Sequence, residues 1–187
     1  MTPIINLDRI QLLNVLPKNA TVAEIGVYRG EYSEHIVKNS HPDKLILIDP
    51  WKTMLDADHV DPKFEYFYNE VVIKFKDNKN IEIIRKTSTD ALQDINNETL
   101  DWVYIDGNHN YEPCLDDLRT YAPKVKEDGY ICGHDWVTRP KPGFGVNQAV
   151  EEFVKETGFV LIGLTNEINF KSYVIAKNSE SASLLNL

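Results

Sequence analysis

The fold is decided by two stretches, Tyr104-Ile105-Asp106-Gly107-Asn108-His109-Asn110-Tyr111 and Gly129-Tyr130-Ile131-Cys132-Gly133-His134-Asp135-Trp136. In each stretch an apolar run ends beside an aspartate and a histidine. If the two runs are neighbouring parallel strands, both pairs lie at the carboxyl edge of one sheet, where open α/β sheets bind ligands. The two aspartates and two histidines can then hold a metal ion, move a proton, or do both.

Short apolar runs alternate with amphipathic segments along most of the chain, which predicts strands alternating with helices. The predicted strands cover residues 21–25, 44–48, 81–84, 100–105, 130–132, 159–164 and 172–176. The predicted helices cover residues 7–16, 31–38, 62–76, 89–95 (with Thr89 as N-cap), 111–125 and 146–157.

This order of elements predicts a Rossmann-like, doubly wound α/β fold: a mostly parallel seven-stranded sheet with helices on both faces. Only residues 165–171 join the last two strands, and a parallel crossover needs about a dozen residues. We therefore expect a C-terminal antiparallel hairpin. We expect one domain over residues 1–177, with a short N-terminal helix within residues 1–20 and a flexible tail at 178–187.

Composition and charge narrow the classes of function. The 187 residues are 42% hydrophobic, which suits one core, and the net charge of −9 disfavours binding to nucleic acid. No apolar run approaches the ~20 residues of a membrane span, and the N-terminus does not resemble a signal peptide. We expect a cytoplasmic protein that binds neither nucleic acid nor membranes, with Cys114 and Cys132 as reduced thiols.

A turn with two glycines follows the first predicted strand, Glu24-Ile25-Gly26-Val27-Tyr28-Arg29-Gly30. Its glycines let the backbone pass close to a ligand, and the following helix offers free amide groups. The spacing is not the G-x-G-x-x-G of dinucleotide-binding proteins. Asp49, at the tip of the second strand, can accept hydrogen bonds from a ribose. Alternatively, the glycines only form a turn and Asp49 only caps a loop.

These motifs together resemble class I S-adenosylmethionine (SAM)-dependent methyltransferases. The glycine turn is similar to their first motif, in which an acid precedes G-x-x-x-G or a near variant. The runs D-G-x-H-x-Y at 106–111 and G-H-D-W at 133–136 are similar to a large bacterial subgroup of that superfamily. The resemblance covers roughly residues 22–136. It implies a SAM-dependent methyltransferase and leaves the substrate open.

The resemblance also implies which positions bind SAM. The glycine turn should line its methionine part, Asp49 should bind its ribose, and Ser88 should contact its adenine. Tyr28 covers the cofactor or packs on the turn, and Glu24 stands where some relatives have Asp. The implied cofactor-binding residues are Glu24, Gly26, Tyr28, Gly30, Asp49, Ser88 and Asp106.

Methyl transfer to a hydroxyl requires an aligned acceptor that loses its proton, and two routes are open. Asp106, Asp135 and His134 can hold a divalent cation such as Mg²⁺ or Mn²⁺, which lowers the pKa of the acceptor. His109, with Asp106, can instead act in catalysis as the proton acceptor. Alternatively, both residues are structural: Asp106 caps the helix that begins at Tyr111, and His134 is a histidine bonded to the backbone.

We therefore expect O-methylation of a small-molecule hydroxyl, of sugar or secondary-metabolite type, assisted by a divalent metal. A metal-independent O- or N-methyltransferase with His109 as base is the nearest alternative. An NAD(P)-dependent oxidoreductase or a non-catalytic SAM-binding protein is another. Residues 51–61 and 139–145 are candidate substrate loops, the second with two cations that can meet an anionic group, and a homodimer is plausible.

Overall fold

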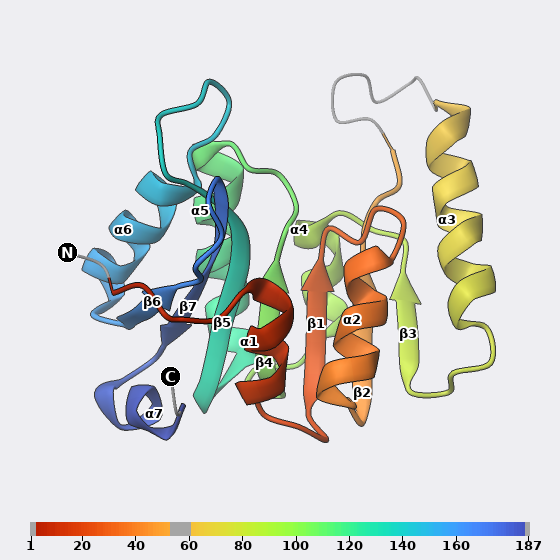
Figure 1. Ribbon diagram of the computed structural model, residues 1–187. Coiled ribbons are helices and arrows are strands. Elements are labelled where there is room, and N and C mark those ends of the chain that lie inside the picture. Colours follow the sequence, from red (N-terminus) through yellow and green to blue (C-terminus); the bar gives the residue numbers. More distant parts are fainter. Residues whose placement is uncertain (1–2, 53–60, 186–187) are drawn as a thin grey trace.

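Seven strands form one mixed sheet in the computed structural model, which describes residues 3–52 and 61–185 (Figure 1). The strand order is β3-β2-β1-β4-β5-β7-β6. Strands β1 to β5 pair in parallel, and β7 pairs antiparallel with both β5 and β6. The predicted fold class, including the C-terminal hairpin, is confirmed. The strands are β1 (Thr21–Ile25), β2 (Lys44–Ile48), β3 (Ile81–Ile84), β4 (Leu100–Ile105), β5 (Val125–Val137), β6 (Val160–Leu164) and β7 (Phe170–Ala176).

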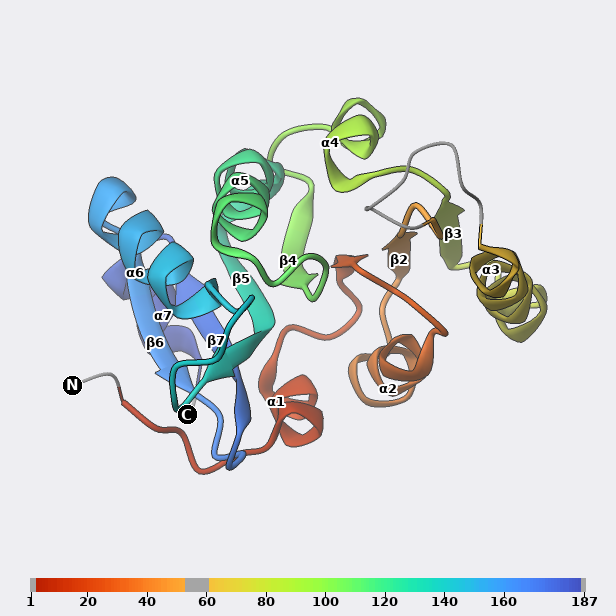
Figure 2. The ribbon, with the colours of Figure 1, turned by 90° about the horizontal axis from the view of Figure 1, so that it is seen from above.

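Helices cover both faces of this sheet, as the view from above shows (Figure 2). Helices α1 and α2 lie on one face with α3 at the β3 edge, and α4, α5 and α6 lie on the other. No described helix combines the length and apolar composition that a membrane crossing requires. The helices are α1 (Arg9–Val15), α2 (Glu31–Ser40), α3 (Pro62–Phe75), α4 (Ser88–Ala91), α5 (Tyr111–Tyr121), α6 (Val146–Thr157) and α7 (Ser179–Leu184), with 3₁₀ turns at Leu92–Asp94 and Ala122–Lys124.

Two hydrophobic cores result, one on each face. Successive residues of a strand point to opposite faces, so a strand buried on both sides feeds both cores. In β2, Leu45 and Leu47 pack with residues of α1, α2 and α3, whereas Ile46 and Ile48 pack with residues of α4, α5 and α6. This double burial explains why the parallel strands are continuous apolar runs.

Strand β5 is longer than predicted at both ends. The predicted helix 111–125 stops at Tyr121, and a 3₁₀ turn through Pro123 leads into a strand that begins at Val125. Pairing of β5 with β4 ends at Gly133, but β5 continues to Val137 because its last residues pair with β7. His134 and Asp135 therefore lie inside a strand and not beyond its tip.

Two further boundaries differ from the prediction. Thr87, not Thr89, caps α4, because its hydroxyl accepts a hydrogen bond from the Asp90 amide at 3.1 Å. At the other end of the chain, Ser179–Leu184 forms α7 where we expected a flexible tail. The Asn178 side chain caps this helix, and the buried Ser181 and Leu185 anchor it against the second core.

The N-terminal segment is tied to the far edge of the sheet. The Ile5 amide donates to the Leu164 carbonyl at 2.8 Å, and the Leu164 amide donates to the Pro3 carbonyl at 2.9 Å. The Asn166 amide reaches the Leu7 carbonyl at 2.9 Å. The start of α1 is thus positioned by the loop between β6 and β7.

The strand order reverses between β1 and β4, which places a topological switch point at their carboxyl ends. Here the backbones come unusually close. A Cβ on Gly26 would lie 2.2 Å from the Asp106 carbonyl oxygen, and Gly26 has a φ of +89°. Only glycine fits this position.

We predict that Gly26→Ala lowers the free energy of unfolding by at least about 3 kcal/mol, at the upper end of common point mutations. The added methyl group meets rigid backbone in addition to an unfavourable φ. Gly158→Ala is the matched control, because Gly158 has a φ of +74° but nothing within 4 Å of an added Cβ. It should cost about 1–2 kcal/mol. Urea denaturation of both variants measures the difference, and equal losses would contradict the proposed crowding.

Candidate functional site at the carboxyl ends of β1, β4 and β5

The turn after β1 is held in an unusual conformation. Three of its residues have positive φ, namely Gly26 (+89°), Tyr28 (+53°) and Gly30 (+69°). The Gly26 amide donates to the Ile48 carbonyl at 2.9 Å, and the Gly30 amide donates to the Val27 carbonyl at 2.8 Å. Gly30 is also the N-cap of α2. The turn therefore presents backbone close to the switch point, as the sequence predicted.

Asp49 fixes this turn from the neighbouring strand. One carboxylate oxygen accepts from the Val27 and Tyr28 amides at 3.0 and 2.9 Å. The other oxygen accepts from the Trp51 amide at 2.7 Å. Burial raises the pKa of Asp49, against these three hydrogen bonds, which lower it. Asp49 thus stabilises the glycine turn through its hydrogen bonds to three backbone amides.

Glu24 is a buried acid inside β1, with 1% of its surface exposed. The Ser33 hydroxyl of α2 donates to its carboxylate. Burial raises the pKa of Glu24 to about 8, in spite of that hydrogen bond, and the charges of Asp106 and Asp49 raise it further. Glu24 is therefore largely protonated at neutral pH.

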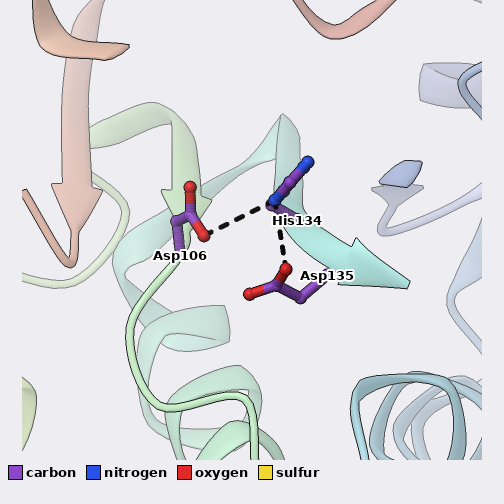
Figure 3. Close-up of side chains that lie close together, drawn as sticks. All are labelled: Asp106, His134 and Asp135. Atoms are coloured by element: carbon purple, nitrogen blue, oxygen red, sulfur yellow. Dashed lines mark ion pairs between the residues drawn. The ribbon is translucent and has the colours of Figure 1, made fainter. Parts of the chain in front are cut away.

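Asp106, His134 and Asp135 form a compact cluster at the ends of β4 and β5 (Figure 3). His134 Nδ1 lies 3.8 Å from Asp106 Oδ1 and 3.4 Å from Asp135 Oδ1. One potential ligand atom from each residue lies within 4.8 Å of the others. In Figure 3 both carboxylates turn toward the imidazole. This is the only such metal-capable group among the described residues.

Backbone geometry explains why adjacent residues of one strand face the same partner. The β5–β7 register shifts between Gly133 and Trp136, and Asp135 has a φ of +61°. Such an irregularity breaks the alternation of side chains along a strand. His134 and Asp135 therefore both reach toward Asp106.

The pKa values of Asp106 and Asp135 shift in opposite directions. Burial raises the pKa of Asp106; the charges of His134 and Arg9 oppose this, while Asp135 adds to it. Burial also acts on Asp135, but its hydrogen bond with His134 and the charges of His134 and His109 outweigh it, so the pKa of Asp135 is lowered. Asp135 is the carboxylate that stays ionised most readily.

His109 approaches the same cluster from the loop after β4. Its Nδ1 lies 3.8 Å from Asp135 Oδ2. Its ring stacks on Phe144 at 4.1 Å between centroids and 11° between planes. The Gly145 amide donates to the His109 carbonyl at 2.8 Å, so the loop after β5 holds His109 in place.

A cavity of about 10 Å³ lies among these side chains. It holds one water-sized group and no more. The lining residues are Ile105, Asp106, Gly107, Asn108, His109, Cys114, His134, Asp135 and Val146. Its acidic and imidazole lining suits a single cation or a water molecule.

The contacts of Asp106 and His134 test whether these residues have purely structural roles. Helix α5 has Asn110 as its N-cap, without a side-chain capping bond, so Asp106 does not cap it. The contacts of His134 are to carboxylates. These contacts disfavour a helix-capping role for Asp106 and a backbone-bonded structural role for His134.

Tyr28 and Ser88, two other predicted site residues, make contacts outside this cluster. Tyr28 is 55% exposed and packs edge-on against Phe67 of α3 at 4.7 Å between centroids. Ser88 opens α4, and its carbonyl accepts from the Tyr121 hydroxyl at 2.8 Å. Most of the candidate loop 51–61 lies outside the described residues.

Sequence reasoning missed two contributors to the cluster. Arg9 Nη1 of α1 lies 3.8 Å from Asp106 Oδ2. Phe144, in the loop after β5, forms the stack beneath His109. Neither residue stands in a motif, because both reach the cluster through tertiary packing.

Comparison with known proteins agrees with this geometry. Protein R132 of Acanthamoeba polyphaga mimivirus is 27% identical over 131 residues, which cover 67% of this chain and 56% of that protein. The chain thus spans about half the length of R132, and it spans 8% of the length of a second curated relative.

Solved structures of other proteins share the fold. A SAM-dependent methyltransferase from Aquifex aeolicus has a TM-score of 0.60 at 18% identity, covering 86% of this chain and 83% of that one. Fibrillarin from Aeropyrum pernix, solved with SAM natively bound, has a TM-score of 0.65 at 11% identity, covering 89% and 73%.

A family model described as a methyltransferase domain matches residues 23–136, from β1 through the Asp135 cluster. The match spans more than half of the chain and includes the glycine turn, Asp49, Asp106 and His134. The narrower bacterial subgroup stays a prediction. On this match, the chain belongs to the methyltransferase domain family.

Proposed function

We propose that this protein transfers the methyl group of SAM to a hydroxyl oxygen of a small molecule, assisted by a divalent cation. The observation that carries the proposal is the cluster of Asp106, His134 and Asp135 beside the glycine turn of a methyltransferase fold. It brings deprotonating groups to the edge where the methyl donor would lie.

The glycine turn supports the placement of SAM. Gly26 lies directly against the Asp106 backbone at the switch point, so the turn adjoins the carboxyl end of β4. In our proposal the methionine part lies along Gly26–Gly30 and the ribose reaches Asp49, with Ser88 near the adenine. Solved neighbours with this fold include one with SAM natively bound.

The donor set of the cluster suits a cation. Ligand atoms around Mg²⁺ or Mn²⁺ lie about 2.1 Å from the ion, so opposite ligands are about 4.2 Å apart. The observed spread of up to 4.8 Å needs only a small inward movement of side chains. Two carboxylates with one imidazole favour Mn²⁺ over Mg²⁺, since imidazole suits transition metals better.

Each residue of the cluster has a distinct part in the proposed reaction. Asp135, with its lowered pKa, and Asp106 supply negative charge, and His134 supplies an imidazole nitrogen. A bound cation would lower the pKa of the acceptor hydroxyl and orient its oxygen. In our proposal His109, whose Nδ1 lies 3.8 Å from Asp135, takes up the released proton. If no cation takes part, His109 is the base of a metal-independent O- or N-methyltransferase.

We predict that S-adenosylhomocysteine and SAM raise the melting temperature of the protein and that NADH does not, measured by thermal shift. Asp49→Asn should weaken S-adenosylhomocysteine binding by at least tenfold, because it disturbs both the turn and the ribose contact. Asp43→Asn, just before β2 on the opposite edge of the sheet, is the control. A shift with NADH alone would instead support the oxidoreductase alternative.

We predict that Mn²⁺ binds with an affinity that Asp135→Ala reduces by at least a hundredfold, measured by calorimetry. Asp128→Asn, an exposed acid of the same strand, should leave this affinity unchanged. Methyl transfer that continues undiminished in excess chelator would remove the metal from the proposal and leave His109→Ala as the variant that abolishes activity.

We predict that Glu24→Gln flattens the dependence of stability on pH. Because the pKa of Glu24 rises on folding from 4.5 to about 8, the folded protein holds a proton that the unfolded chain releases. This contribution is complete below pH ~4.5 and is lost as the pH rises toward 8. Wild type should therefore lose several kcal/mol more than Glu24→Gln between pH 5 and 8. Denaturation at a series of pH values measures the free energy of unfolding of both proteins, and the same dependence on pH in both would contradict the buried, protonated state. The exposed Glu82→Gln is the control and should behave like wild type.

A further inference from the structure

The guanidinium of Arg9 lies beside the acid cluster without making a hydrogen bond. Its nearest carboxylate oxygen, Asp106 Oδ2, is 3.8 Å away, beyond hydrogen-bonding distance. Among the described residues, no protein group accepts from its side-chain nitrogens. The side chain is 35% exposed, so its N–H groups can still reach a ligand.

The surroundings hold Arg9 in this position. The Arg9 amide donates to Glu167 Oε1 at 2.6 Å, and the Tyr32 hydroxyl donates to the Arg9 carbonyl at 3.2 Å. The guanidinium carbon lies 4.9 Å from the centroid of the Tyr32 ring. The Asp8 side chain caps α1, which makes Arg9 the first residue of that helix. An arginine packed over an aromatic ring keeps its donor fork ordered.

Three of the other four arginines are paired with glutamates, and the fourth, Arg139, is an exposed residue of the loop after β5. Arg29 makes two hydrogen bonds to Glu70 at 2.8 and 3.0 Å. Arg85 donates to Glu65 at 2.6 Å. Arg119 likewise donates to Glu156. Unlike these three paired arginines, Arg9 keeps its fork open, and it does so at the edge of the sheet where ligands bind.

A second cation, Lys141, lies near the two histidines of the same site. Lys141 Nζ is 4.2 Å from the centroid of Phe144 and 4.5 Å from that of Phe170. Phe144 stacks on His109, and the centroid of Phe170 lies 6.4 Å from that of His134. Lys141 makes no ion pair with a described carboxylate. Arg9 thus lies next to Asp106, and Lys141 lies next to the rings that contact His109 and His134.

Building on the proposed function, we propose that Arg9 binds an oxyanion of the methyl acceptor, which is therefore a small hydroxyl compound carrying a carboxylate or phosphate. The guanidinium fork matches the two oxygens of such a group. Asp106 links the two halves of the site, since Oδ2 faces Arg9 and Oδ1 faces His134. An acceptor anchored on Arg9 would bring its hydroxyl toward His134, Asp135 and His109.

The cofactor also carries a carboxylate, and it is the competing occupant. Two observations favour the acceptor. The Arg9 guanidinium pairs with Asp106, whose other oxygen faces His134 of the deprotonating cluster, and among the described residues no hydrogen bond or ion pair joins its side chain to residues 26–30. Lys141 adds a second positive charge on the His109 side of that cluster.

The test titrates inorganic phosphate into the chelator-treated protein saturated with S-adenosylhomocysteine, with sodium chloride of equal ionic strength as reference. Thermal shift reports the dissociation constant of phosphate. We expect Arg9→Gln to raise this constant at least tenfold and Arg9→Lys to raise it less, because charge remains but the fork is lost. Arg119→Gln removes the same charge on the outer surface of α5 and should leave the constant unchanged.

Three results would overturn the proposal. The first is an equal loss of phosphate binding in Arg9→Gln and Arg119→Gln, and the second is no phosphate response in the wild type. The third is that Arg9→Gln weakens the binding of S-adenosylhomocysteine tenfold or more but leaves the binding of methylthioadenosine unchanged. Because methylthioadenosine lacks the carboxylate, this result would assign Arg9 to the cofactor. Failure of the wild type to bind S-adenosylhomocysteine would overturn the proposed function instead, and phosphate titration of the free protein would still decide on Arg9.

Discussion

The close approach of Gly26 to the Asp106 carbonyl is the constraint on which the candidate site depends. Where β1 and β4 separate, two backbones lie so near that a Cβ would overlap a carbonyl oxygen. This contact sets the distance between the glycine turn and the acidic end of β4. Asp49 then fixes the turn from the opposite side through the Val27, Tyr28 and Trp51 amides. The two halves of the crevice are thus held by rigid backbone.

The irregularity in β5 supplies the second half of the site. A regular strand would point His134 and Asp135 to opposite faces of the sheet. The register shift before Trp136 and the left-handed conformation of Asp135 turn both side chains toward Asp106. A non-glycine residue in that conformation is uncommon. Such local strain is characteristic of functional sites, and it accompanies the charge pairing of the cluster here.

The sequence was sufficient for the fold and for the main cluster. Apolar runs marked every strand, and because β4 and β5 are parallel neighbours, the residues after each run had to meet. The true end of β5 was not predictable, since Gly133 and His134 interrupt the apolar run while pairing with β7 extends the strand. Arg9 was missed for a similar reason. Its contact with Asp106 depends on how α1 docks, which local pattern does not encode.

That docking has a consequence for the order in which the protein can assemble. The segment before Arg9 is bonded to Leu164 and Asn166, and Glu167 holds the Arg9 amide. During synthesis these partners emerge from the ribosome only after β1 to β5, long after α1 itself has emerged. Until then, the acidic ends of β1 and β4 lack their positioned counter-charge. Helix α1 thus reaches its working position only after β6 and β7 have formed, and the nascent protein cannot hold Arg9 beside Asp106 before that hairpin closes.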